Sequence, residues 1–186
     1  MSLPLFTAAF ACWRATHELV AEGPACKLPT ESVVKLSIKA IPEARTAETL
    51  GAEREGTGVV IGTDELIVTI GYLIMEADSV LVITQDGRIF PALPIGFDQV
   101  TGFGLLRAVS SVAAAPIALG SSESLREFDQ VYPVTHSAAG GASTAYLISR
   151  RSFTGYWEYM IDDAIFTSPP RFDHSGAALI NRSGTL

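Results

Sequence analysis

The sequence predicts an all-β protein, and three observations support this prediction. From Ser32 to Asn181, short runs of apolar or alternating residues recur roughly every ten residues. Turn-forming residues separate most of these runs. Apart from residues 122–128, no segment after residue 30 has a convincing helical pattern. Many short strands with little helix are typical of a β-sandwich or a β-barrel, and periodicity alone does not distinguish the two.

The first set of strands is expected to begin at Ser32. The run SVVKLSIKAI alternates and is rich in β-branched residues until Pro42, where a central strand cannot continue. Residues 43–55 are polar and charged, which is typical of a solvated loop. The runs GTGVVIG, ELIVTIGYLI, SVLVITQ and RIFPALPIGF then predict closely spaced strands. Asp86-Gly87 between the last two predicts a hairpin, because glycine accepts the positive φ of a tight turn.

A second set of strands follows a stretch of small residues, SSVAAAP, which has no periodicity and is expected to connect two halves. The runs QVYPVTH, STAYLISRRSF, WEYMIDDAI and AALIN are again short. Gly140-Gly141, Gly155 and Pro169-Pro170 interrupt them, as turn residues do. The whole region therefore continues the all-β pattern.

Composition excludes several classes of function. The chain has 186 residues, of which 48% are hydrophobic, enough for the core of one full domain or two small ones. A net charge of -7 without a cluster of Lys and Arg argues against nucleic acid as a partner. No apolar run has the length of a spanning helix, so we expect no membrane span. Three histidines and two cysteines without ligand spacing predict no metal, and we expect no cofactor.

The N-terminal segment leaves two interpretations. Residues 3–11 are apolar and end in small residues before Cys12, as in a signal peptide or lipoprotein leader, but no Lys or Arg precedes them. We favour an apolar extension, with Trp13 and Leu19 at helical spacing, that packs onto the domain. Two cysteines exclude a disulfide framework, and a single bridge from Cys12 to Cys26 stays open. Localisation, cytoplasmic or periplasmic, is left open as well.

Several of the predicted strands follow one another in a familiar order. These segments are SVVKL, GTGVVI at residues 56–61, IVT at 67–69, VITQDGRIFPALPIGFD at 82–98, TGFGLLR, PIALGSSESLREFDQV, and HSGAALI at 174–180. Together they resemble the protease domain of the HtrA/Deg branch of the chymotrypsin-like serine proteases. The resemblance implies a double β-barrel of two six-stranded Greek-key barrels. It divides the chain into an N-terminal extension (1–31), a first barrel (32–112) and a second barrel (113–186), which is incomplete because Leu186 follows Ser175 so closely.

The resemblance also assigns the catalytic positions, and two of them are degenerate. A serine protease needs a hydroxyl nucleophile, an imidazole base and a carboxylate that orients the base. Ser175 stands at the nucleophile position, but Tyr72 stands at the histidine position and Gly102 at the aspartate position. A phenol with an ordinary pKa near 10 is a poor base at neutral pH. Without the resemblance, Tyr72 would be interpreted as an aromatic side chain of the barrel core or of the groove wall. Gly102 and Ser175 would be interpreted as turn residues.

The loop before Ser175 departs from the family as well. Asp173 occupies the place of the glycine whose backbone N–H helps to form the oxyanion hole, and His174 follows it. A carboxylate there is expected to oppose the negative charge that the hole must stabilise. The segment FTSPPRFDH is also longer than the loop of the family.

A replacement base is the main alternative. His174 is adjacent to Ser175, and neighbouring side chains usually diverge. His136, at the end of QVYPVTH, is expected near the substrate groove and would be the alternative base of a Ser175/His136 dyad. The three lysines all lie in the first fifth of the chain and are poorly placed to serve.

Three functions therefore remain. The first is a catalytically impaired pseudoprotease whose groove or strand edge binds a peptide, an unfolded-protein segment or a protein partner. The second is an active serine hydrolase that uses Ser175 with a non-standard base. The third is a structural or assembly module whose groove is closed, with a homo-oligomer left open.

Overall fold

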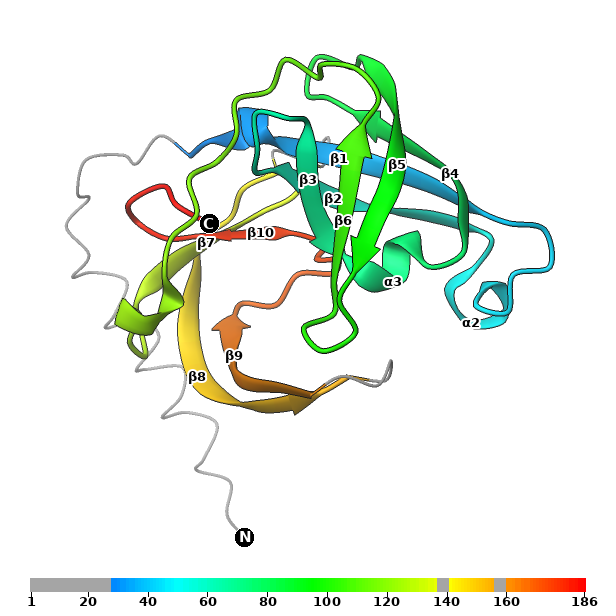
Figure 1. The fold of residues 1–186 in the computed structure, drawn as a ribbon. Coiled ribbons are helices and arrows are strands. Elements are labelled where there is room, and N and C mark those ends of the chain that lie inside the picture. Colours follow the sequence, from blue (N-terminus) through cyan, green and yellow to red (C-terminus); the bar gives the residue numbers. More distant parts are fainter. Residues whose placement is uncertain (1–27, 137–140, 156–159) are drawn as a thin grey trace, which may run out of the picture.

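The computed structural model describes residues 28–136, 141–155 and 160–186, and these residues confirm the all-β prediction (Figure 1). Ten strands form one closed barrel and one open sheet. None of the helices in this part of the chain combines the length and apolar character that crossing a bilayer requires. The predictions for the apolar N-terminal run, for Trp13 and Leu19, and for a bridge from Cys12 to Cys26 concern residues outside the described ranges.

The first six strands close into an antiparallel barrel in the order β1-β2-β3-β6-β5-β4. Their bounds are β1 (Val33–Ala40), β2 (Glu53–Val60), β3 (Leu66–Ile70), β4 (Ala77–Ile83), β5 (Ile89–Phe97) and β6 (Phe103–Ala108). Leu36, Ile67, Val82 and Leu106 point inward and are fully buried. Alternate residues of each strand thus fill the barrel, which makes the first half of the molecule a stable frame.

The hairpin predicted at Asp86-Gly87 is confirmed. Gly87 has a φ of +80° and donates its N–H to the carbonyl of Thr84 at 2.9 Å. Thr84 in turn donates its N–H to the carbonyl of Arg88 at 3.0 Å. The turn joins β4 to β5, which pair antiparallel.

Two expectations for the first half were wrong. Residues 43–55 are not a solvated loop throughout, since they contain the helix α2 (Ala47–Leu50) and the start of β2, where Arg54 is buried. The run ELIVTIGYLI is not one strand, because β3 ends at Ile70 and the helix α3 (Gly71–Ile74) follows. Leu73 and Ile74 of α3 are buried at the end of the barrel. A short helix therefore buries the apolar residues that the sequence analysis assigned to a strand.

The other helical segments are single 3₁₀ turns. η1 spans Thr30–Ser32 and precedes β1. The helix considered for residues 122–128 is limited to η2 (Ser122–Ser124), which the Ser121 hydroxyl caps by accepting the N–H of Glu123.

The second half is a four-stranded sheet in the order β10-β7-β8-β9, which is half of a barrel. Its strands are β7 (Gln130–Val134), β8 (Ala145–Thr154), β9 (Met160–Ser168) and β10 (Ala178–Ile180). The expected strand WEYMIDDAI begins at Met160, and the residues before it lie outside the described ranges. The prediction of a complete first barrel and an incomplete second one is therefore confirmed.

The two halves share a second apolar cluster. Val33 and Val59 of the barrel pack with Val134, Ala178 and Ile180 of the sheet, and all five are buried. This cluster packs β10 and β7 of the sheet against the barrel. The domain boundary between residues 112 and 113 stays a prediction.

Candidate active site

Tyr72 and Ser175 meet where the two halves of the molecule face each other. Tyr72 lies on α3 at the end of the barrel, and Ser175 lies on the loop between β9 and β10. The Tyr72 hydroxyl donates a hydrogen bond to Ser175 Oγ at 2.6 Å, across 103 residues of sequence. Tyr72 also packs against the core of the barrel. The structure thus brings together two of the three positions that the sequence singled out.

Gly102 contributes backbone only. It has a φ of +76° in the turn before β6, and its N–H donates to the carbonyl of Asp98 at 2.8 Å. Its own carbonyl accepts the N–H of Gly71 at 2.7 Å, which ties this turn to the first residue of α3. No carboxylate is supplied at this position to orient a base. A Cβ at Gly71 would overlap the Phe97 ring, so a larger residue there would require this ring to shift.

The Ser175 loop is fixed to the barrel by its backbone. Thr57 of β2 donates its N–H to the carbonyl of Ser175 at 2.8 Å. Gly176 has a φ of +72°, and a Cβ at this residue would overlap the carbonyl oxygen of Thr57. Ala177 closes the turn by donating its N–H to the carbonyl of His174 at 2.9 Å. The serine is therefore held in one place by contacts that the barrel supplies.

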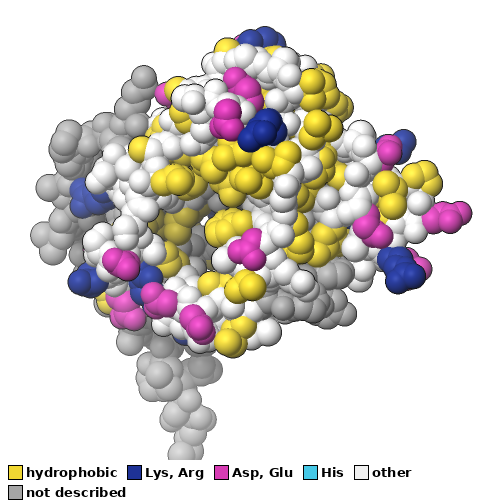
Figure 2. Space-filling model, viewed as in Figure 1, with side chains coloured by type: hydrophobic (Ala, Val, Ile, Leu, Met, Phe, Trp, Pro, Cys, Tyr) yellow, Lys and Arg dark blue, Asp and Glu magenta, His cyan; other side chains and the backbone are white. Residues whose placement is uncertain are grey.

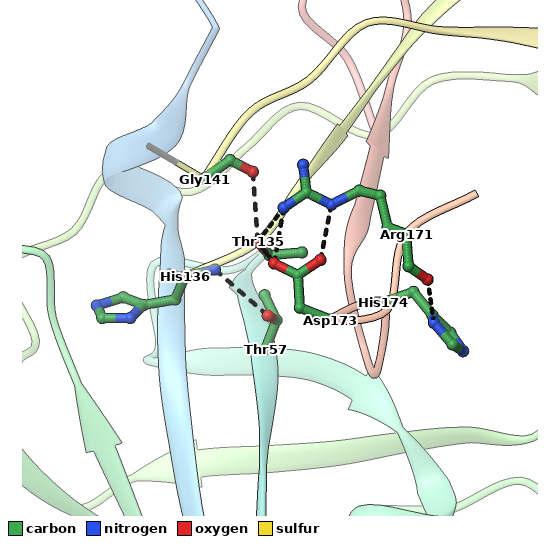
Figure 3. Close-up of polar contacts among 7 residues, drawn as sticks. All are labelled: Thr57, Thr135, His136, Gly141, Arg171, Asp173 and His174. Carbon is green, nitrogen blue, oxygen red and sulfur yellow. Dashed lines mark hydrogen bonds and ion pairs between the residues drawn. The ribbon is translucent and has the colours of Figure 1, made fainter. Parts of the chain in front are cut away.

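Asp173 is paired with a cation, which the sequence analysis did not anticipate (Figure 3). Its carboxylate lies 2.6 Å from the Arg171 guanidinium and accepts the Thr135 hydroxyl at 2.9 Å. These contacts, with the Arg171 hydrogen bond as the largest cause, lower the pKa of Asp173 to about 2. The same pair raises the pKa of Arg171. The negative charge expected to oppose an oxyanion is thus offset by a guanidinium two residues earlier in the chain.

The two histidines of the site lie in different surroundings. Nδ1 of His174 is 2.8 Å from the carbonyl oxygen of Arg171. His136 donates its backbone N–H to the Thr57 hydroxyl at 3.3 Å, and Figure 3 shows its ring turned away from the Arg171–Asp173 pair. Nε2 of His136 is buried without a hydrogen-bond partner among the described residues.

Two hollows flank Ser175. One, of about 620 Å³, lies between the barrel and the open sheet, and Figure 2 shows hydrophobic side chains gathered around it. Its apolar lining includes Val59, Val68, Leu125, Val131, Phe153, Ile165 and Ala178. The other, of about 540 Å³, is lined by His136 and Asp173 together with Ser175. Within the described ranges no three His, Cys, Asp or Glu side chains are grouped as metal ligands would be.

Replacing Asp173 by asparagine is expected to cost stability in a pH-dependent way. The pKa of this carboxyl falls from 3.8 to about 2 in the folded protein, so its contribution is fully present above 3.8. The contribution is lost as the pH falls through about 2, the folded pKa. The free energies of unfolding of the two proteins, measured with urea, should therefore converge as the pH is lowered through this window. Taking the difference between the two free energies of unfolding removes the contributions of the other carboxylates, which are the same in both proteins. A difference that stays constant with pH would contradict the Arg171–Asp173 pairing.

Comparison with known proteins places the chain in a family. The family described as "Trypsin-like peptidase domain" matches residues 56–186. The serine endoprotease DegS of Salmonella typhimurium is 28% identical over 137 residues, which are 70% of this chain and 37% of DegS. The serine protease PepD of Mycobacterium tuberculosis is 31% identical over 114 residues, which are 55% of this chain and 25% of PepD. The chain thus spans well under half the length of these curated relatives.

Solved structures confirm the chymotrypsin-like fold. The HtrA-type protease AlgW, solved with a tripeptide, superimposes with a TM-score of 0.68 at 18% identity over 84% of this chain and 49% of AlgW. The inactive form of the Rv3671c protease gives a TM-score of 0.66 at 19% identity over 85% of this chain and 75% of that one. At these identities the likeness concerns the fold alone.

Proposed function

This chain belongs to the trypsin-like peptidase domain family, and from this membership we propose that it is an HtrA-type domain that binds an extended peptide or protein segment and cleaves it little or not at all. The single observation that carries the proposal is the hydrogen bond from the Tyr72 hydroxyl to Ser175 Oγ at 2.6 Å. A general base must accept the proton of the nucleophile, and a phenol is a poor proton acceptor at neutral pH compared with an imidazole. The group that contacts the nucleophile is therefore of the wrong chemical type to activate it.

The carboxylate member of the triad is missing as well. Gly102 has no side chain, so nothing at this position would fix the tautomer of a base or stabilise its charged form. Loss of a triad member costs a serine protease several orders of magnitude in turnover. Two such losses around a retained Ser175 support a domain that cleaves inefficiently.

Peptide binding is supported by the surfaces that remain. The hollow of about 620 Å³ beside Ser175 is lined mainly by apolar side chains that would accept an apolar residue of a peptide. An extended segment would add its main chain to a strand edge next to this hollow, and this mode of binding needs no catalytic group. The AlgW relative was solved with a tripeptide, which is consistent with a peptide as ligand.

A fluorophosphonate probe tests the proposal directly. We expect no covalent labelling of the folded wild-type protein by intact mass, the same result as for Ser175→Ala. A fluorescent peptide library should nevertheless contain binders that are recovered uncut after prolonged incubation. Stoichiometric labelling that disappears in Ser175→Ala would contradict the proposal, because it would mean that the Ser175 hydroxyl is activated.

One observation favours an active hydrolase as the second candidate. Nε2 of His136 has no hydrogen-bond partner among the described residues, and His136 lines a hollow together with Ser175. If the probe labels Ser175, His136→Gln decides between the bases: loss of labelling in this variant would assign the role to His136. Retention would exclude His136 as the base.

A further inference from the structure

Arg54 is a buried cation with an unusual set of partners. It lies on β2 and is 4% exposed. Its Nε donates to the carbonyl of Gly51 at 3.0 Å, and Nη2 donates to the Thr46 hydroxyl at 2.7 Å. Its Nη1 donates to the carbonyls of Tyr72 at 3.0 Å and Met75 at 2.7 Å. A guanidinium is costly to bury, so this convergence of acceptors from separate segments has to be accounted for.

One of these acceptors belongs to the helix that carries the phenol, and another belongs to the residue that follows this helix. The last carbonyls of a helix have no partner within it, and α3 has only four residues (Gly71–Ile74). Arg54 binds the carbonyl of Tyr72 itself and that of Met75, the residue at which α3 ends. At the other end, Gly71 donates its N–H to Gly102. The backbone of Tyr72 is thus held on one side while its hydroxyl meets Ser175 on the other.

The Glu76 carboxylate extends the hydrogen-bond network of Arg54 through Thr46. Glu76 accepts the backbone N–H of Thr46 at 2.8 Å and its hydroxyl at 2.6 Å. The Thr46 hydroxyl bond, followed by the Thr46 N–H, lowers the pKa of Glu76. Burial lowers the pKa of Arg54, and the negative charge of Glu76 opposes this effect. Glu76, Thr46 and Arg54 therefore form a continuous chain of polar contacts that ends on the carbonyl of Tyr72.

We propose that Arg54 is a positioning residue that sets the Tyr72 phenol against Ser175 Oγ through the carbonyls of α3. Arg54 donates to three carbonyls and a hydroxyl, and the three N–H donors of a lysine ammonium on a flexible stem do not reproduce these four bonds. The inference rests on the Tyr72–Ser175 contact that also carries the proposed function. Replacing the Arg54 guanidinium should therefore weaken the contact between the Tyr72 hydroxyl and Ser175 Oγ, in addition to any loss of stability.

Nuclear magnetic resonance of the Tyr72 ring measures this coupling. The protein is prepared with carbon-13 at the ζ position of its five tyrosines, and Tyr72→Phe assigns the Tyr72 signal. In the wild-type background, Ser175→Ala should move this signal because the acceptor is removed. In the Arg54→Lys and Arg54→Met backgrounds, we expect Ser175→Ala to move the Tyr72 signal by less than about a third of its displacement in the wild-type background. Such non-additivity is the signature of coupled residues.

A matched control separates positioning from stability. Arg88→Met removes an arginine that pairs with Asp86 at the surface hairpin, and there Ser175→Ala should move the Tyr72 signal as in the wild type. A displacement that stays undiminished in the Arg54 variants would overturn the proposal and leave Arg54 a merely structural role. If Arg54→Met does not fold, Arg54→Lys and Thr46→Val, which deletes the Nη2 acceptor, decide the question. Probe labelling of Ser175 is not used here, so failure of the proposed function would be seen separately.

Discussion

The double variant Tyr72→His/Gly102→Asp is expected to hydrolyse peptides and to be labelled by a fluorophosphonate at Ser175. The Tyr72 hydroxyl already lies 2.6 Å from Ser175 Oγ, so α3 aims its side chain at the nucleophile. An imidazole there would accept the proton of Oγ, and a carboxylate at residue 102 would fix its tautomer. General acid–base catalysis is worth roughly 100-fold or more, so the double variant should be labelled under conditions that leave the wild type unlabelled.

The single variants provide the controls for this gain of activity. Gly102→Asp alone should gain nothing, because the group that contacts Ser175 would still be a phenol and not an imidazole. Tyr72→His alone should gain less than the pair, since its imidazole would lack an orienting partner. The φ of +76° at residue 102 is one that aspartate adopts more readily than most residues, at a cost of about 1 kcal/mol. A folded double variant that shows no labelling would mean that the loop before Ser175, and not the lost triad, limits the chemistry.

The sequence predicts the fold better than it predicts the site. Local turn chemistry places the hairpin at Asp86-Gly87 correctly, because a glycine with positive φ needs no tertiary context. The resemblance to HtrA/Deg protease domains predicts one complete barrel and one incomplete one, which the structure shows. Alternation fails at α3, where Leu73 and Ile74 are as buried in a helix as they would be in a strand. Periodicity cannot separate the two in an apolar run this short.

The contacts of the site depend on residues far apart in sequence. The resemblance placed Tyr72 and Ser175 at facing positions, but their direct contact at 2.6 Å depends on the packing of α3 against the barrel. Arg54 was missed because an arginine in a polar segment predicts exposure, and only the tertiary fold brings the carbonyls of α3 to it. The Arg171–Asp173 pair was missed because these residues lie in a loop, where sequence spacing does not determine which side chains meet.

Gly176→Ala is expected to destabilise the protein more than any other single glycine replacement near the site. A Cβ at this residue would overlap the carbonyl oxygen of Thr57 and would lie 2.6 Å from the Thr69 hydroxyl. The Thr57 carbonyl is fixed, because it is part of β2 and accepts the Thr69 hydroxyl at 2.7 Å. Overpacking against rigid backbone, added to the strain of a positive φ, should lower the free energy of unfolding by more than about 3 kcal/mol. Urea unfolding of the variant measures the loss.

Gly87→Ala separates the two parts of this cost. Gly87 has a φ of +80°, close to the +72° of Gly176, but a Cβ there meets nothing within 4 Å. Its replacement should therefore cost only the strain of the left-handed backbone, about 1 kcal/mol. The additional loss of free energy of unfolding in Gly176→Ala then measures the close contact with the Thr57 carbonyl. This is where the Ser175 loop packs against the barrel. Equal losses in the two variants would mean that the loop moves away from Thr57 at little cost, and that the barrel does not fix Ser175 in place.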